Sequence, residues 1–280
     1  MVAMKKPMLV LATLAALAAA ALTGAALVIY RGIYDISATS QHLQPVHALL
    51  ETTMRQSVRL RARDITTPPL EGGQRLARGA ALFRDHCVQC HGAPGVAQSG
   101  FGQSMQPVPG PLVDARQRWR PREIYWITRH GIKMSGMPAW QFRLDEQSLW
   151  DVVAFVNTLP ALSPQAYVQM TEGAGAAPQR REEAPQRAGD VERGKLALGQ
   201  YACQACHTIP GITSSSPNVG PPLQGLASRS LIAGKLANTP DNLVLWVRDP
   251  KSVKPLTAMP DMGVSEADAR DMAAYLSTLR

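Results

Sequence analysis

The chain contains few aromatic residues and few cysteines. Phe, Trp and Tyr together make up 5% of its 280 residues, and only four residues are cysteine. A chain of this length can hold two small domains, and neither could fill its core with rings alone. A bound apolar group would supply the missing volume. All four cysteines lie in two short motifs, so the chain has no stray thiol, which favours an oxidising compartment.

Acidic residues are outnumbered by basic ones. The chain has 21 Asp and Glu against 29 Lys and Arg, a formal net charge of +8. The densest basic group, here called the arginine segment, consists of Arg116, Arg118, Arg120 and Arg122. We expect it either to attract an acidic partner or cofactor group, or to be a solvated turn. Nucleic-acid binding is not expected, because no recognised binding motif surrounds the segment.

One motif occurs twice. It reads Cys87-Val88-Gln89-Cys90-His91 in the first copy and Cys203-Gln204-Ala205-Cys206-His207 in the second. In C-x-x-C-H the two thiols add across the vinyl groups of a haem, and the histidine reaches the iron as its proximal ligand. Two copies therefore predict two covalently held haem c groups.

Zinc is the main alternative, because four cysteines in two C-x-x-C pairs can form a tetrahedral site. However, the pairs lie more than a hundred residues apart, a histidine follows each directly, and each has a Met-Pro downstream. These features favour haem. A disulfide framework is less favoured still, because nothing else in the chain resembles a small, loop-stapled domain.

A single long apolar run lies near the N-terminus, from Met8 to Tyr30. It matches the roughly 20 residues that cross a hydrocarbon core as a helix, whereas the apolar part of a signal peptide has about 7–15. We therefore expect residues 1–30 to be an uncleaved anchor, although the alanine-rich interior leaves cleavage open. Lys5 and Lys6 precede the run, so the positive-inside rule places the remainder outside the cytoplasm. That is also the compartment in which haem is attached through thioethers in bacteria, so we expect a single-pass protein of a bacterial inner membrane, with its domains in the periplasm.

Four further regions follow the anchor. Residues 31–71 are expected to be a stalk with a helix from Gln44 to Arg63, followed by a first domain (72–164), a linker (165–189) and a second domain (190–280). The linker is rich in Ala, Gly, Pro, Gln and charge from Thr171 to Gly189. The apolar face of the stalk helix is expected to rest on the first domain or on a partner. That face comprises Val46, Leu49, Leu50, Met54 and Val58.

The two domains form an internal repeat. Gly79 and Phe83 precede the first motif, and Gly194 and Leu198 precede the second with the same spacing. Residues 145–159 align without a gap with residues 265–279, and Asp145 and Ser265 are good N-caps. We expect the first and last helices of each unit to cross closely at the glycine. Phe155 or Tyr275 would pack at the crossing.

Each repeat resembles a class I cytochrome c domain: an N-terminal helix, C-x-x-C-H, a loop, Met-Pro and a C-terminal helix. The second repeat is similar to the cytochrome c domains of caa-type haem-copper oxidases, through Gly220-Pro221-Pro222-Leu223, residues 246–250 (WVRDP) and residues 254–260 (KPLTAMP). The first is similar to membrane-anchored cytochromes of the same setting, through residues 124–126 (IYW) and 130–140 (HGIKMSGMPAW). The resemblance implies an all-α chain, with a transmembrane helix followed by two tandem domains.

The sixth iron ligand of the second domain is narrowed by elimination. After His207 no histidine remains in the chain, so Met259, Met262, a lysine or nothing in this chain would take the position. The shared Met-Pro context favours Met259, with Met262 as the alternative. Met272, on the closing helix, is expected in the core.

In the first domain the candidates for the sixth iron ligand are Met137, Met134, Met105 and His130. The repeat selects Met137, which has the same Met-Pro context as Met259. Thioether sulfur is a soft ligand that favours ferrous iron, so His/Met ligation raises the reduction potential.

Further residues would orient these ligands. The resemblance implies that the Pro221 carbonyl accepts a hydrogen bond from His207. The first domain has Pro109-Gly110-Pro111-Leu112 instead, which leaves the matching carbonyl open. Trp126 and Trp246 are either propionate donors through their indole N–H groups or plain core tryptophans.

These features predict an electron carrier without catalytic residues. It would be a membrane-anchored dihaem cytochrome that passes single electrons from a quinol-oxidising complex or a soluble cytochrome to a terminal oxidase. One alternative is the cytochrome subunit of a periplasmic dehydrogenase. Another is a dihaem peroxidase-like enzyme, which needs an exchangeable position on one iron.

Overall fold

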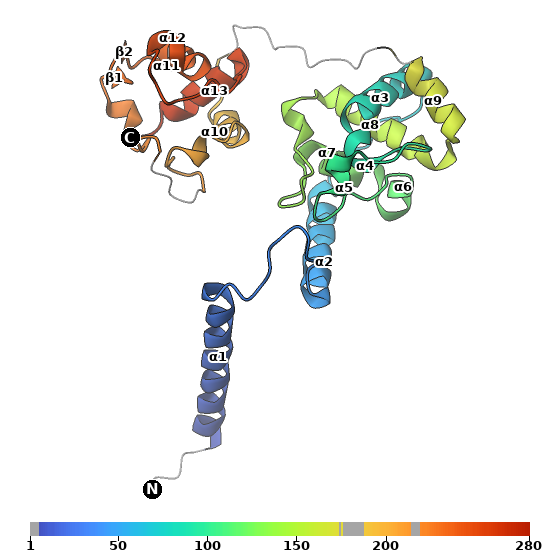
Figure 1. Cartoon of the computed structure of the whole chain (residues 1–280), viewed down its shortest axis with the longest axis horizontal. Helices are drawn as coiled ribbons and strands as arrows, with labels where there is room; N and C mark the ends of the chain where they lie inside the picture. The colour runs from blue at the N-terminus through green and yellow to red at the C-terminus, as the bar shows by residue number, and fades with distance from the viewer. Residues whose placement is uncertain (1–5, 174, 176–187, 214–218) are drawn as a thin grey trace. The chain divides into compact units, whose positions relative to one another are not determined.

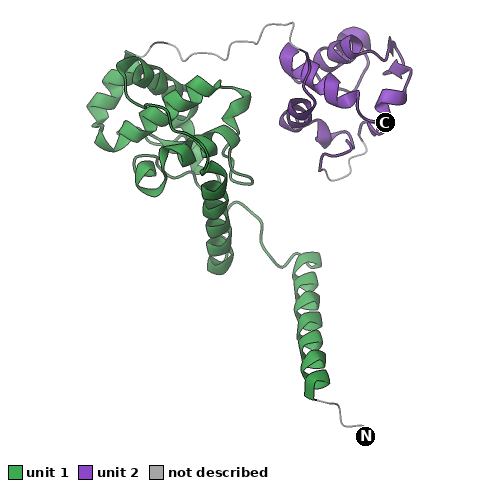
Figure 2. Cartoon of the chain, turned by 180° about the vertical axis from the view of Figure 1, so that it is seen from behind, with its two compact units in different colours: residues 1–180 green, residues 181–280 purple. Residues whose placement is uncertain are grey.

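The structure, a computed structural model, describes residues 6–173, 175, 188–213 and 219–280. Helices make up nearly all the regular structure of these residues. The exception is one antiparallel pair of two-residue strands, β1 (Leu231–Ile232) and β2 (Leu236–Ala237). The expected all-α class is confirmed. The chain divides into two compact units, residues 1–180 and 181–280 (Figure 2).

Helix α1 (Lys6–Tyr30) contains the apolar run. Among the described helices it is the one that is long and apolar enough to cross a membrane, judged by length and composition. A signal sequence would pass the same test.

Helix α2 (Gln44–Ala62) begins with Pro45 in its first turn, where a missing N–H costs nothing. Its last turns pack against α7, where Val58 and Ala62 are buried. Leu49 and Leu50 are exposed. The expected apolar face therefore meets the first domain only near its C-terminal end.

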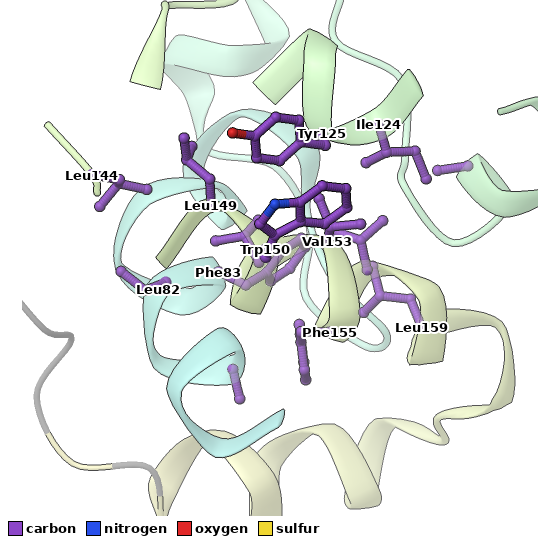
Figure 3. Packing of buried hydrophobic residues seen from close by; sticks show 14 of the residues in the cluster. Leu82, Phe83, Ile124, Tyr125, Leu144, Leu149, Trp150, Val153, Phe155 and Leu159 are labelled. Atoms are coloured by element: carbon purple, nitrogen blue, oxygen red, sulfur yellow. The ribbon is translucent and has the colours of Figure 1, made fainter. Parts of the chain in front are cut away.

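The first domain follows α2 (Figure 1). Its elements are α3 (Gly73–His86), α4 (Val88–His91), α5 (Gly100–Gln103), α6 (Ala115–Arg118), α7 (Pro121–His130), η1 (Trp140–Phe142), α8 (Glu146–Thr158), η2 (Leu159–Ala161) and α9 (Pro164–Glu172). Its core is unexpectedly rich in rings: Phe83 and Phe155 meet between α3 and α8, and Tyr125 stacks on Trp150 with 4.1 Å between ring centroids (Figure 3). The chain's few aromatic residues are thus concentrated here.

In the structure, the first part of the expected linker is a helix and not an irregular segment. Residues 164–172 form α9, which begins at the Ser163 N-cap. Tyr167 on this helix is buried, and its ring lies 6.4 Å from that of Phe83. A buried aromatic residue explains why this stretch belongs to the first domain. Residues 174 and 176–187, most of the remaining expected linker, lie outside the described part.

The second domain contains α10 (Val191–Gln200), η3 (Cys203–Ala205), η4 (Leu226–Ser228), the β1–β2 pair, α11 (Pro240–Arg248), α12 (Pro250–Val253) and α13 (Glu266–Leu276). Leu198, Ile209 and Met272 are buried in its core. The expectation that Met272 is a core residue is confirmed.

In each domain the first helix crosses the helix that follows the Met-Pro at a glycine, as expected: α3 crosses α8, which α9 then follows, and α10 crosses α13. A Cβ atom on Gly79 would overlap the Asp151 carbonyl and approach Phe155, and one on Gly194 would overlap the Asp271 carbonyl. The absence of side-chain atoms at these glycines lets α3 approach α8, and α10 approach α13, this closely.

In each domain an ion pair that the sequence analysis did not anticipate joins the same helices, between a buried aspartate and a more exposed arginine. Arg78 on α3 donates to Asp151 on α8 (2.7 Å), and Arg193 on α10 donates to Asp271 on α13 (3.0 Å). Both aspartates are buried. They are matching residues of the repeat, so each pair helps to set the register of its helix crossing.

Candidate functional site

Each C-x-x-C-H motif forms a tight turn, and the two turns contain the same backbone hydrogen bonds. The amide of His91 donates to the Cys87 carbonyl (2.9 Å), and that of His207 donates to the Cys203 carbonyl (3.0 Å). A helical turn places residues three and four apart on one side. The turn therefore presents two sulfur atoms and an imidazole together.

All four cysteines are free thiols and are partly buried. Burial raises the pKa of Cys87 to about 12, and it also raises the pKa of Cys203. These two sulfurs are therefore held as neutral thiols in apolar surroundings.

Each motif histidine is oriented by a backbone carbonyl. Nδ1 of His91 donates to the Gly110 carbonyl (2.7 Å), and Nδ1 of His207 donates to the Pro221 carbonyl (2.8 Å). Burial lowers the pKa of His91, although the bond to Gly110 opposes the shift. A neutral ring with Nδ1 engaged keeps its Nε2 lone pair for a metal.

The Gly110 carbonyl is the acceptor that the sequence analysis left open. Aligning the two repeats on Leu112 and Leu223 would have identified it, because both acceptors lie two residues before that leucine. Counting from the motif hides the match, since the histidine and its acceptor are 19 residues apart in one domain and 14 in the other.

The second motif cysteine is also fixed through its carbonyl. Gln98 donates its side-chain amide to the Cys90 carbonyl (2.7 Å), and in the second domain the Gly220 amide donates to the Cys206 carbonyl (2.8 Å). A Cβ atom on Gly220 would run into the His207 ring. Sequence reasoning missed both contacts.

A cavity of about 480 Å³ lies beside His91. It is bordered by the residues that follow the first motif and by the loop that includes Gly110, and its lining is mainly apolar. Representative lining residues are Val96, Val108, Leu112, Val113 and Leu159. An apolar cavity next to an available imidazole suits a planar aromatic metal complex.

The two favoured methionines share a turn that was not anticipated. The amide of Met137 donates to the Ser135 hydroxyl (3.3 Å), and that of Met259 donates to the Thr257 hydroxyl (3.2 Å). Both methionines are half-buried. A hydroxyl residue two positions before each Met-Pro is the sequence signal of this turn.

The competing methionines differ in exposure. Met134 is 99% exposed and adopts a left-handed backbone (φ 57°), and Met262 is 43% exposed. Met105 is half-buried and lies close to Gly136. Exposure thus favours Met137 over Met134, and Met259 over Met262, as the ligands.

The tryptophans and the arginine segment occupy varied surroundings. Trp126 is half-buried on α7, with its ring 4.9 Å from that of His130, and Trp246 is half-buried on α11. A propionate bond from either indole stays a prediction.

Within the arginine segment, Arg118 pairs with Asp114 (2.7 Å), and Arg122 donates to the Arg63 carbonyl beyond α2 (3.1 Å). Arg122 is therefore partly structural.

The residues present fit haem c. Each motif supplies two free thiols and an imidazole with Nε2 available, and a half-buried methionine follows it along the chain. In the first domain the apolar cavity borders the imidazole. Among the described residues no three His, Cys, Asp or Glu side chains gather to hold a metal ion.

Family models match both domains. Residues 74–156 match the family described as cytochrome c oxidase, cbb3-type, subunit III, and residues 191–280 match the cytochrome c family. Cytochrome c domains carry covalent haem c and transfer electrons.

Two curated proteins are similar to part of the chain. Cytochrome c oxidase subunit 2 of Alkalihalophilus pseudofirmus is 34% identical over 93 residues, which is 32% of this chain and 26% of that protein. Dihydro-heme d1 dehydrogenase of Pseudomonas aeruginosa is 30% identical over 89 residues, which is 32% of this chain and 16% of that protein. The chain thus matches a minor part of each relative's length.

The two matched families, the repeated motif and the shared helix crossing lead to one assignment. The chain belongs to the class I cytochrome c family and carries two of its domains in tandem.

Proposed function

We propose that the chain is a membrane-anchored cytochrome with two haem c groups, which passes single electrons to, or within, a haem-copper terminal oxidase. The observation that supports it most directly is the donor set, which recurs in each domain. The proposed attachment residues are Cys87, Cys90, Cys203 and Cys206, and the proposed iron ligands are His91, Met137, His207 and Met259. The bound groups supply a reversible one-electron iron couple.

The chain's own residues would hold the ligands in place. The carbonyls of Gly110 and Pro221 orient the two imidazoles, and the hydroxyls of Ser135 and Thr257 set the two methionine turns. A ligand set that is already positioned needs little rearrangement when the charge of the site changes. It also leaves no position that a small molecule could take without displacing a methionine, as expected for a carrier.

The oxidase setting is supported by similarity. The first domain matches a model of an oxidase subunit, and one curated relative is an oxidase subunit. Helix α1 supports a single membrane anchor, and the lysines before it support periplasmic domains in a bacterial inner membrane. A quinol-oxidising complex or a soluble cytochrome would be the electron donor.

A second candidate is the cytochrome subunit of a periplasmic dehydrogenase, supported by the similarity to dihydro-heme d1 dehydrogenase. Purification of the full chain in mild detergent, with identification of the co-purifying subunits, separates the two. Oxidase subunits are expected. Recovery of a dehydrogenase subunit in their place would contradict the oxidase setting.

A peroxidase-like enzyme is disfavoured, because a half-buried methionine follows each motif. Ferric spectra of the full chain test this point. A methionine–iron charge-transfer band from both sites is expected for a carrier, and a stable high-spin site would contradict it.

A further inference from the structure

An aromatic contact connects residues 131–142, here called the Met137 loop, to the first motif. Trp140 follows Met137 by three residues, and its ring lies 5.0 Å from that of His86, at an interplanar angle of 43°. His86 ends α3 and directly precedes Cys87. One contact therefore joins the residue beside the thiol pair to the segment that carries the proposed methionine ligand.

Two further contacts attach this loop to its domain. Arg129 on α7 donates to the side chain of Gln141, next to Trp140 (3.4 Å). The methyl group of Met105 lies so close to Gly136 that an added Cβ would be 2.9 Å from it. The Met137 loop thus meets α3, α7 and the segment around Met105.

The second domain lacks the aromatic pair. Ala202 precedes Cys203, and Met262 follows Met259 by three residues. Helix α10 ends at Gln200, and Ala202 adopts a left-handed backbone (φ 53°), so two residues separate the end of α10 from this motif.

Residues 254–263, here called the Met259 loop, are attached to their domain differently from the Met137 loop. In the described part of the domain, the hydrogen bonds found for residues 255–263 stay within the segment 254–263. Leu256 is 96% exposed and Met262 is 43% exposed. Among the described residues, no hydrogen bond from residues 255–263 to the domain beyond Lys254 therefore resists the movement of this loop away from the core.

We propose that Trp140 is a positioning residue that fastens the Met137 loop to α3, and that Met259, which has no such fastening, is the ligand that an added neutral nitrogen base displaces first. The inference rests on the methionine ligation in the proposed function. The exchange forms one nitrogen–iron bond, breaks one sulfur–iron bond and changes no oxidation state. The second domain would then be a binding site for bases of the imidazole class, while the first stays closed.

The test uses the full chain in detergent, in the ferric state, titrated with imidazole. Met259→His leaves Met137 as the only methionine ligand, and Met137→His leaves only Met259. The charge-transfer band then reports one loop at a time. We expect the band of Met259→His to persist to at least about threefold higher imidazole than that of Met137→His, because an aromatic pair shifts an equilibrium by roughly twofold to tenfold.

Variants of the contact complete the test. In the Met259→His background, Trp140→Ala should lower the imidazole midpoint by about twofold to tenfold, and Trp140→Phe, which keeps a ring, should restore most of it. His86→Ala removes the other half of the contact and should act like Trp140→Ala. It gives the same test if Trp140→Ala does not accumulate.

The outcomes separate this inference from the proposed function. Equal midpoints for the two loops, or an unchanged midpoint in both His86→Ala and Trp140→Ala, would overturn the inference and leave the methionine ligands in place. Loss of the band in either single histidine variant before imidazole is added would overturn the ligand assignment itself.

Discussion

Asp151 is 0% exposed, yet its carboxylate faces two arginines of α3. Arg75 lies 3.3 Å and Arg78 2.7 Å from its oxygens. In the second domain the matching residue, Asp271, forms an ion pair with Arg193. A carboxylate removed from water needs such partners, and loss of its charge leaves the arginines without theirs.

Asp151→Asn should therefore lower the free energy of unfolding of the first domain by about 1.5–3 kcal/mol, the range for hydrogen bonds to charged groups. Asp271→Asn should act in the same way on the second domain. Urea titration of the full chain, followed by hydrogen exchange in α8 and α13, measures both effects. The unmutated domain is the internal control, and unchanged protection in the mutated domain would contradict the prediction.

Substitution of neighbouring methionines tests the first ligand assignment. Met134→Leu should leave the methionine–iron band intact, because the side chain is 99% exposed. Met137→Leu should remove the contribution of the first site. The reverse pattern in ferric absorption spectra would assign the ligand to Met134.

Single-residue contacts were predictable only where a repeat or a resemblance located them. The bond from His207 to Pro221 followed from resemblance, and the structure contains it. The matching acceptor Gly110 was hidden, because the loop after the first motif is five residues longer (19 against 14). The partners of Asp151 depend on how two helices cross, which sequence alignment does not report.

At the scale of elements, the helix crossings depend on glycine. Gly194→Ala would force a methyl group into the Asp271 carbonyl, and overpacking of this kind costs about 1–3 kcal/mol. Gly199→Ala lies on the same helix with nothing within 4 Å, so it should be neutral or stabilising by up to about 1 kcal/mol. Thermal unfolding of the second domain compares the two. Equal effects would show that the close approach does not limit stability.

The arginine segment divides into two roles. Arg116 and Arg120 are exposed, although Arg116 also donates to the Asn157 carbonyl (3.3 Å). Serine at both positions should slow electron exchange with an acidic partner at low ionic strength, and the effect should fade as salt is added. Arg122→Ser should instead loosen the contact beyond α2, because Arg122 donates to the Arg63 carbonyl. Stopped-flow rates at two ionic strengths give the measurement. A salt-independent rate in the double variant would remove the docking role.

Helix existence was predictable from periodicity, but helix contacts were not. The stalk helix was expected at Gln44–Arg63 and occupies Gln44–Ala62. Its leucines are exposed because only the last turns reach α7. Helix α9 was missed because its sequence directly precedes a stretch of linker composition, and its burial depends on Tyr167 meeting rings from two other helices.

At the scale of the whole molecule, α1 carries the membrane proposal. The full chain should appear in the membrane fraction, whereas residues 31–280 behind a cleavable export signal should appear in the periplasmic extract. The physical reason is the loss of one apolar span of about 20 residues. A full chain found in the soluble extract would mean that α1 is removed as a signal sequence.

The account as a whole depends on covalent haem c in both domains. The most direct test is the intact mass of the mature chain under denaturing conditions, where only covalent groups remain. We predict a mass that exceeds the polypeptide by two haem groups, falling to one when Cys203 and Cys206 are replaced by alanine. A mature chain at the bare polypeptide mass, or one that carries zinc in metal analysis, would contradict the account.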